Sequence, residues 1–118
     1  MTLRARLRRG AALSLAASLV LPVAAGPAFA DGNAAAGRKK AQACAPCHGI
    51  DGLAKLPNAA NLAGETVFYL DKQLKAFRAG ERKDENMTVV AKALSDQDIA
   101  DLAAWYSSIE VSVKLPGQ

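Results

Sequence analysis

The stretch Cys44-Ala45-Pro46-Cys47-His48 brings two thiols and one imidazole together within five residues. The chain has 118 residues, and it contains two cysteines and one histidine in all. Every cysteine and histidine side chain therefore belongs to this one stretch, and we expect the fold to be built around it.

The spacing C-x-x-C-H is typical of covalent haem attachment. Two thiols add across the two vinyl groups of a haem, and two intervening residues set the cysteines at the matching separation. The adjacent histidine is then held beneath the iron. We therefore expect one covalent haem c, with Cys44 and Cys47 as its thioether residues and His48 as an axial ligand of the iron.

Three other chemistries use the same residue types. A disulfide between Cys44 and Cys47 would be sterically tight and would close only a very short loop. A thioredoxin-like redox pair needs a strand followed by a helix, and no strand pattern is present. A zinc site needs four ligands, so it would have to recruit a carboxylate. Haem attachment is the interpretation that the motif and a secreted chain together favour.

The first 30 residues have the pattern of a secretory signal peptide. Residues 1–9 carry four arginines and no acid, an apolar run follows, and Ala28-Phe29-Ala30 is a small-x-small cleavage site. A transmembrane anchor is the alternative, but Pro22 interrupts the run and much of it is alanine. We expect cleavage after Ala30 and export to the periplasm of a domain comprising residues 31–118, with no stable membrane insertion.

The charge of the chain supports this division. The whole sequence has 15 basic and 11 acidic residues and a formal charge of +4. The four arginines of residues 1–9 account for the excess, so residues 31–118 hold equal numbers of bases and acids. A neutral domain gives no reason to expect binding to nucleic acid or to anionic lipid.

Residues 31–118 show helical patterns throughout. Helices are predicted over residues 34–43, 65–79 and 87–94, and a last helix starts after Ser95. The stretch 50–64 is rich in Gly, Pro and Asn and is predicted to be a loop. The fold class is therefore all-α, with about four helices. A structureless loop of this length in a small domain is expected to wrap a bound group.

Local signals specify where these helices begin and end. Ser95 and Asp98 resemble a capping box at the start of the last helix, and Gly80 is placed to end the helix before the charged connection 81–86. Gly37 lies within a stretch of good helix-forming residues, where a glycine lowers helix stability. Either the helix tolerates this loss, or another helix approaches closely at Gly37.

The second axial ligand follows by elimination. His48 has no second histidine to pair with, and Met87 is the one methionine of residues 31–118. It lies 39 residues beyond His48, which is far enough for the chain to cross to the other haem face. Met87 is therefore the candidate, with a core-filling methionine, a lysine ligand and an open site as alternatives. His/Met ligation raises the reduction potential and fills both axial positions.

Together these residues resemble class I bacterial cytochromes c, of the small soluble monohaem group similar to c553 and c5. The resemblance covers residues 31–118 and rests on the following segments: Gly37, Cys44–Gly49, Asn61–Gly64, Tyr69–Leu74, Phe77–Gly80, Met87, Leu94–Ile99 and Ala103–Tyr106.

The resemblance implies further roles. Gly37 would lie where the first and last helices cross. A backbone carbonyl, usually from a proline, would accept the Nδ1–H of the axial histidine, and Pro57 is the candidate. The family often has its proline closer to the Leu-Ala-Gly segment, where this chain has residues 59–61. Asn86 beside Met87 would either contact the ligand or cap a helix.

The function implied is that of a monomeric periplasmic electron shuttle and not an enzyme. It would take one electron from a donor, such as a dehydrogenase, and pass it to an acceptor, such as a terminal oxidase. Two alternatives remain open. In the first, the protein would be a dedicated electron-accepting subunit of one periplasmic dehydrogenase; in the second, it would be a haem-based ligand sensor in which the sixth position opens.

Overall fold

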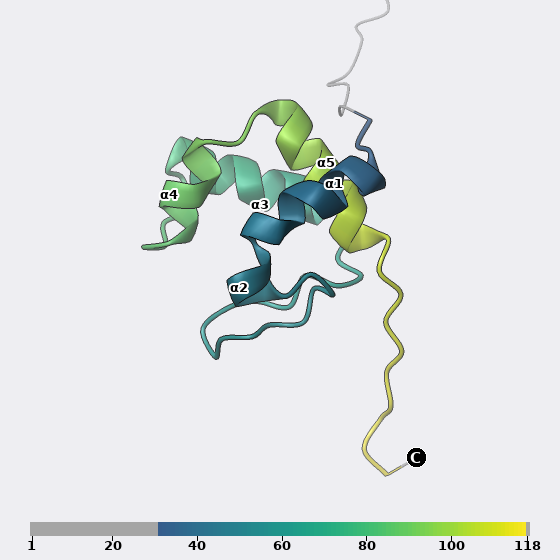
Figure 1. Cartoon of the computed structure of the whole chain (residues 1–118). Coiled ribbons are helices and arrows are strands. Elements are labelled where there is room, and N and C mark those ends of the chain that lie inside the picture. The colour runs from purple at the N-terminus through teal and green to yellow at the C-terminus, as the bar shows by residue number, and fades with distance from the viewer. Residues whose placement is uncertain (1–30, 118) are drawn as a thin grey trace, which may run out of the picture.

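A computed structural model describes residues 31–117, and the predicted signal peptide 1–30 lies outside them. Within this part of the chain all regular elements are helices. They are α1 (Ala34–Lys40), η1 (Ala41–Ala43), α2 (Ala45–His48), α3 (Val67–Ala79), α4 (Met87–Lys92) and α5 (Asp96–Ser107), as Figure 1 shows. The all-α class is confirmed, and the one-turn helix α2 is an addition to the four predicted helices.

The predicted start of α5 and end of α3 are confirmed, whereas α3 begins at Val67 and not at residue 65, and α4 ends at Lys92 and not at residue 94. The Ser95 side chain accepts the N–H of Asp98, and the Asp98 carboxylate accepts the N–H of Ser95, which completes the capping box. Thr66 caps α3 by accepting the N–H of Tyr69. Gly80 ends α3 in the left-handed region, with φ of 77°. Local sequence signals therefore determine both ends of α3 and the start of α5.

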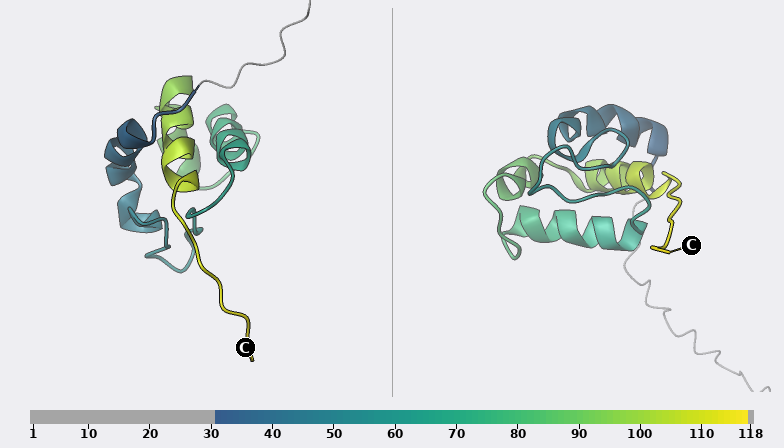
Figure 2. Two further views of the ribbon diagram at one scale, coloured as in Figure 1. Left: turned by 90° about the vertical axis from the view of Figure 1, so that its right-hand side faces the viewer. Right: turned by 90° about the horizontal axis from the view of Figure 1, so that it is seen from below.

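Helix α5 is the centre of the fold and lies between α1 and α3 (Figure 2). It contributes Leu102, Ala103 and Tyr106 to the buried core, which Ala41 and Leu70 complete. A Cβ at Gly37 would lie 1.9 Å from the carbonyl oxygen of Asp101. The predicted close approach of the first and last helices at Gly37 is therefore confirmed, because only glycine fits at this crossing.

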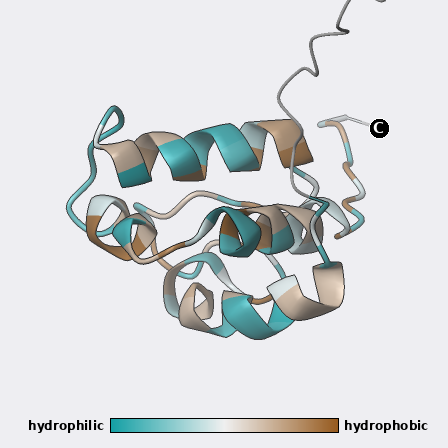
Figure 3. Ribbon diagram, turned by 90° about the horizontal axis from the view of Figure 1, so that it is seen from above, coloured by the Kyte–Doolittle hydropathy of each residue, from teal (hydrophilic) through white to brown (hydrophobic). Residues whose placement is uncertain are grey.

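Apolar surface also remains outside this core. Figure 3 shows hydrophobic residues, in brown, in the first turn of α3 and in parts of the chain beyond α5. Val67 and Phe68 are exposed in that turn, and Val111 is exposed beyond α5. None of the helices within residues 31–117 is long and apolar enough to cross a membrane.

The long loop between α2 and α3 is attached to α5 by hydrogen bonds. The Trp105 Nε1–H donates to the carbonyl of Ile50 at 3.1 Å, and the Tyr106 hydroxyl donates to that of Gly49 at 3.2 Å. The N–H of Gly64 returns a bond to the Tyr106 carbonyl at 3.0 Å. Burial raises the pKa of the Tyr106 phenol, which therefore stays protonated and able to donate. Both ends of the loop are thus held by the last turns of α5.

A carboxylate cluster joins α1 to α5. Buried Asp101 accepts the N–H of Asn33 at 2.8 Å and the side-chain amide of Gln97 at 2.9 Å. The Lys40 ammonium lies 2.6 Å from Asp98 and 3.6 Å from Asp101. The bond from Asn33 chiefly lowers the pKa of Asp101, and the bond from Lys40 chiefly lowers that of Asp98.

This cluster predicts acid sensitivity. Because the folded-state pKa values of Asp98 and Asp101 lie below the ordinary value of 3.8, their contribution to stability is complete above about pH 4. It is lost as the pH falls through the folded values. Denaturant unfolding between pH 7 and pH 2 is expected to show stability declining below about pH 4. The Asp101→Asn variant should show a flatter decline, whereas Glu110→Gln, an exposed carboxyl beyond α5, should follow the wild type.

Candidate haem-binding site

The one-turn helix α2 arranges the two thiols and the imidazole. Cys44 is its N-cap residue, and the Cys44 carbonyl accepts the N–H of Cys47 at 3.2 Å and that of His48 at 2.9 Å. Pro46 is accommodated in the first turn, where a backbone N–H has no helical partner. Side chains three and four residues apart share one helix face. The C-x-x-C-H spacing therefore places all three groups on the same side of the chain.

The two cysteines are free thiols, each half-buried. They form no disulfide with each other, so the structure does not support that alternative. Burial raises the pKa of the Cys44 thiol, whereas a thioredoxin-like nucleophile requires a lowered one. Among residues 31–117 no three His, Cys, Asp or Glu side chains converge to hold a metal ion such as zinc. The thiols remain available for haem attachment.

His48 is oriented by the loop that follows it. Its Nδ1 lies 2.8 Å from the carbonyl oxygen of Ala60. A carbonyl only accepts, so this contact fits the tautomer that carries its proton on Nδ1 and leaves the Nε2 lone pair for a metal. The prediction that Pro57 supplies this carbonyl is wrong.

The reason for this correction is the path of the loop. The Gly52 carbonyl accepts the N–H groups of Leu62 and Ala63, and the Asn61 side chain accepts the N–H of Ala54 at 2.8 Å. These bonds fold the second half of the loop back onto the first and carry Ala60 to His48. The signal that could have found Ala60 was its place just before the Leu-Ala-Gly segment, in residues 59–61.

Met87 is half-buried and is the first residue of α4. Asn86 stands at the N-cap position, but its side chain makes no capping bond, so the alternative that this side chain caps the helix is wrong. The cap is Asp84, whose carboxylate accepts the N–H groups of Asn86 and Met87 at 2.9 Å each. Sequence reasoning missed Asp84, although aspartate is a preferred capping residue and typically accepts the N–H groups two and three residues further along the chain.

The segments that carry His48 and Met87 are within electrostatic range of each other. The pKa of Asp84 is lowered chiefly by the N–H bonds from Met87 and Asn86, and to a smaller extent by the charges of Arg82 and His48. The charge of His48 therefore acts on the turn that precedes α4, although it is the weakest of these influences on Asp84.

Apolar side chains accompany both segments. Leu53 and Leu56 in the loop after His48 are 50% and 45% exposed. Val89 and Val90 in α4 are 69% and 45% exposed. A domain this small gains little from leaving large apolar groups in water, and a haem held between the two segments would have these side chains to contact. The donor set and the apolar surroundings therefore both suit a haem.

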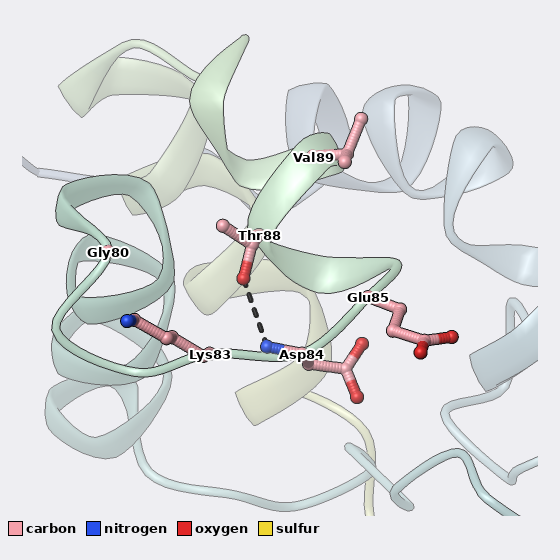
Figure 4. A pocket seen from close by; sticks show the side chains of 6 residues that line it. All are labelled: Gly80, Lys83, Asp84, Glu85, Thr88 and Val89. Atoms are coloured by element: carbon pink, nitrogen blue, oxygen red, sulfur yellow. Dashed lines mark hydrogen bonds between the residues drawn. The ribbon is translucent and has the colours of Figure 1, made fainter.

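A surface pocket lies between the end of α3 and the start of α4, as Figure 4 shows. It is lined by Gly80, Lys83, Asp84, Glu85, Thr88 and Val89. It contains neither the cysteines nor His48, so it is separate from the candidate haem site. The turn that forms one wall of this pocket leads directly into Met87.

Comparison with known proteins agrees with this geometry. Residues 34–110 match the cytochrome c family. The chain is 50% identical over 82 residues to cytochrome c-554(548) of Halomonas halodenitrificans, and the alignment covers 67% of this chain and 99% of that protein. It is 38% identical over 82 residues to the thiosulfate dehydrogenase electron acceptor of Thiomonas intermedia, covering 68% of this chain and 37% of that one.

A solved structure shows the same fold. The structure of reduced recombinant cytochrome c4 from Pseudomonas stutzeri superposes with a TM-score of 0.64 and 43% sequence identity. The superposition covers 70% of this chain and 48% of the cytochrome c4 chain. The chain thus spans nearly all of one relative and less than half of the two others.

Proposed function

Because the chain belongs to the cytochrome c family, with the all-α fold of class I and a covalent haem c, we propose that it is a periplasmic one-electron carrier. In this proposal cleavage after Ala30 leaves residues 31–118 as the working domain. Cys44 and Cys47 form the thioethers, and His48 and Met87 are the axial ligands. The cofactor supplies one-electron exchange between ferric and ferrous iron, with no bond made or broken in the substrate.

The observation that carries this proposal is the bond between His48 and the Ala60 carbonyl. It fits the tautomer that leaves the Nε2 lone pair of His48 free for a metal, and it restrains the ring. A ligand that keeps its orientation in both oxidation states keeps the reorganisation energy of electron transfer small. The histidine is therefore prepared to remain a ligand in both states.

Met87 suits the opposite position for a chemical reason. A thioether is neutral and soft, so it favours ferrous over ferric iron and raises the reduction potential. With His48 and Met87 both bound to the iron, oxygen and peroxide would find no open site. The chain also has no second histidine to act as a general acid or base. These features favour electron transfer over catalysis of a bond-forming reaction.

The absorption spectrum of the exported protein, compared with that of Met87→Ala, tests this proposal. The wild type is expected to be low-spin in both oxidation states and to show the methionine–iron charge-transfer band when ferric. In Met87→Ala we expect complete loss of that band, retention of the haem, and stoichiometric carbon monoxide binding by the reduced form. Rapid carbon monoxide binding by the wild type at neutral pH would instead indicate a ligand sensor whose sixth position opens.

A dedicated electron-accepting subunit is the second candidate. It is favoured by the relative named thiosulfate dehydrogenase electron acceptor, of which this chain spans 37%. The free shuttle is expected to elute as a monomer in size-exclusion chromatography, alone or mixed with periplasmic extract. A lasting stoichiometric complex with a dehydrogenase would favour the subunit and would count against the free shuttle.

A further inference from the structure

The turn before α4 is organised around one residue, Asp84. Its carboxylate accepts the N–H groups of Asn86 and Met87, and its carbonyl accepts the N–H of Thr88 at 3.1 Å. Its own N–H donates to the Thr88 hydroxyl at 3.0 Å, the bond drawn in Figure 4. Asp84 thus bonds the N–H groups of three successive residues, with Met87 in the middle.

The chain between α3 and α4 is also attached to α3, at Arg82. The N–H of Arg82 donates to the Ala76 carbonyl at 3.1 Å, and the Arg82 guanidinium lies 4.6 Å from the centre of the Phe77 ring. This contact fastens the chain to the last turn of α3. Between Arg82 and α4, the side chain of Asp84 is the element that ties the backbone of Met87 to the preceding chain.

We infer that Asp84 is a positioning residue for Met87, which holds the thioether where the iron can bind it. This inference rests on the proposed His48 and Met87 ligation. Helix α4 has only six residues and little stability of its own, so its first turn depends on its cap. A cap that is lost frees the Met87 backbone and raises the fraction of molecules in which the thioether has left the iron.

Competition by added imidazole measures this fraction in the mature holoprotein. Imidazole binds ferric iron only after the methionine has left, so its apparent affinity reports how easily Met87 leaves. In Asp84→Ala we expect imidazole to bind about fivefold more tightly than in the wild type, the factor that the loss of one helix cap would give. The methionine–iron charge-transfer band should also be weaker in the ferric variant.

Two further variants separate position from charge and from general stability. Asp84→Asn keeps an oxygen that accepts the two N–H bonds but removes the charge, and it should bind imidazole within about twofold of the wild type. Thr66→Ala removes the cap of α3, away from Met87. It should lower the thermal stability to a similar extent and leave imidazole binding unchanged.

The outcomes are distinct. If Asp84→Ala loses stability but binds imidazole like Thr66→Ala, Asp84 is only a structural cap and the inference is overturned. If the wild type itself lacks the charge-transfer band, the ligation by Met87 fails first. If Asp84→Ala does not accumulate with haem, Thr88→Val replaces it in the test. This variant removes the acceptor of the Asp84 N–H, and it is expected to bind imidazole about twofold more tightly than the wild type. An unchanged affinity in Thr88→Val would then overturn the inference.

Discussion

A double variant with Cys44→Ser and Cys47→Ser is expected to contain no covalently bound haem. A thioether forms when a thiol adds across a vinyl group, and a serine hydroxyl does not add in this way. Serine is close to cysteine in size and is a favourable N-cap, so the backbone of α2 should persist. Extraction with acidified acetone should remove all haem from the double variant and none from the wild type.

Single variants and one control sharpen this test. Cys44→Ser and Cys47→Ser should each keep one thioether and therefore resist extraction, with a shifted absorption maximum in the reduced form. Met87→Ala should keep its haem fully, because the methionine takes no part in the covalent attachment. Haem that stays with the double variant after extraction would contradict attachment through these cysteines.

The variant Gly37→Ala is expected to lower the free energy of unfolding by about 2–3 kcal/mol, the upper part of the range of about 1–3 kcal/mol typical of an overpacked core. A Cβ at this position would lie 1.9 Å from the Asp101 carbonyl oxygen and 2.8 Å from the Trp105 Cβ. The nearest atom belongs to the backbone of a packed helix, so α1 and α5 must move apart. This cost exceeds the gain of about 1 kcal/mol that alanine brings inside a helix. Guanidinium chloride unfolding of the holoprotein measures the difference.

A second glycine provides the matched control. Gly80 ends α3 with a positive φ of 77°, but a Cβ there would meet no atom within 4 Å. Gly80→Ala therefore incurs only the backbone cost, which is about 1 kcal/mol. If Gly37→Ala proves no more destabilising than Gly80→Ala, the close helix crossing does not govern stability.

The helices could be predicted from the sequence because their signals are local. The apolar spacing, the capping box at Ser95 and the stop at Gly80 all act within a few residues, and each has the predicted effect. Gly37 was also a local signal, because a glycine inside a helix costs stability and therefore indicated either a tolerated weakness or a close contact. The partner in this contact, Asp101 in α5, could not be identified from the same pattern.

The cap of α4 shows where local patterns were insufficient. A cap at the adjacent Asn86 was one of two roles predicted for that residue, yet Asp84 caps the helix. The choice between two polar residues depends on how the turn is held between α3 and α4. Arg82 bonded to Ala76 sets the direction from which the chain enters this turn, and that is a contact between separate elements.

By itself the sequence determined the all-α class, the order of the helices and the residues available to a haem. A spacing of two cysteines and a histidine is a property of consecutive residues, and a single methionine remains in residues 31–118. The tertiary structure decided that Ala60, and not Pro57, meets His48, and that Asp84 holds the Met87 backbone. Both contacts depend on how a loop closes in space, because distance and direction select the backbone carbonyl or the capping carboxylate among several that the sequence offers.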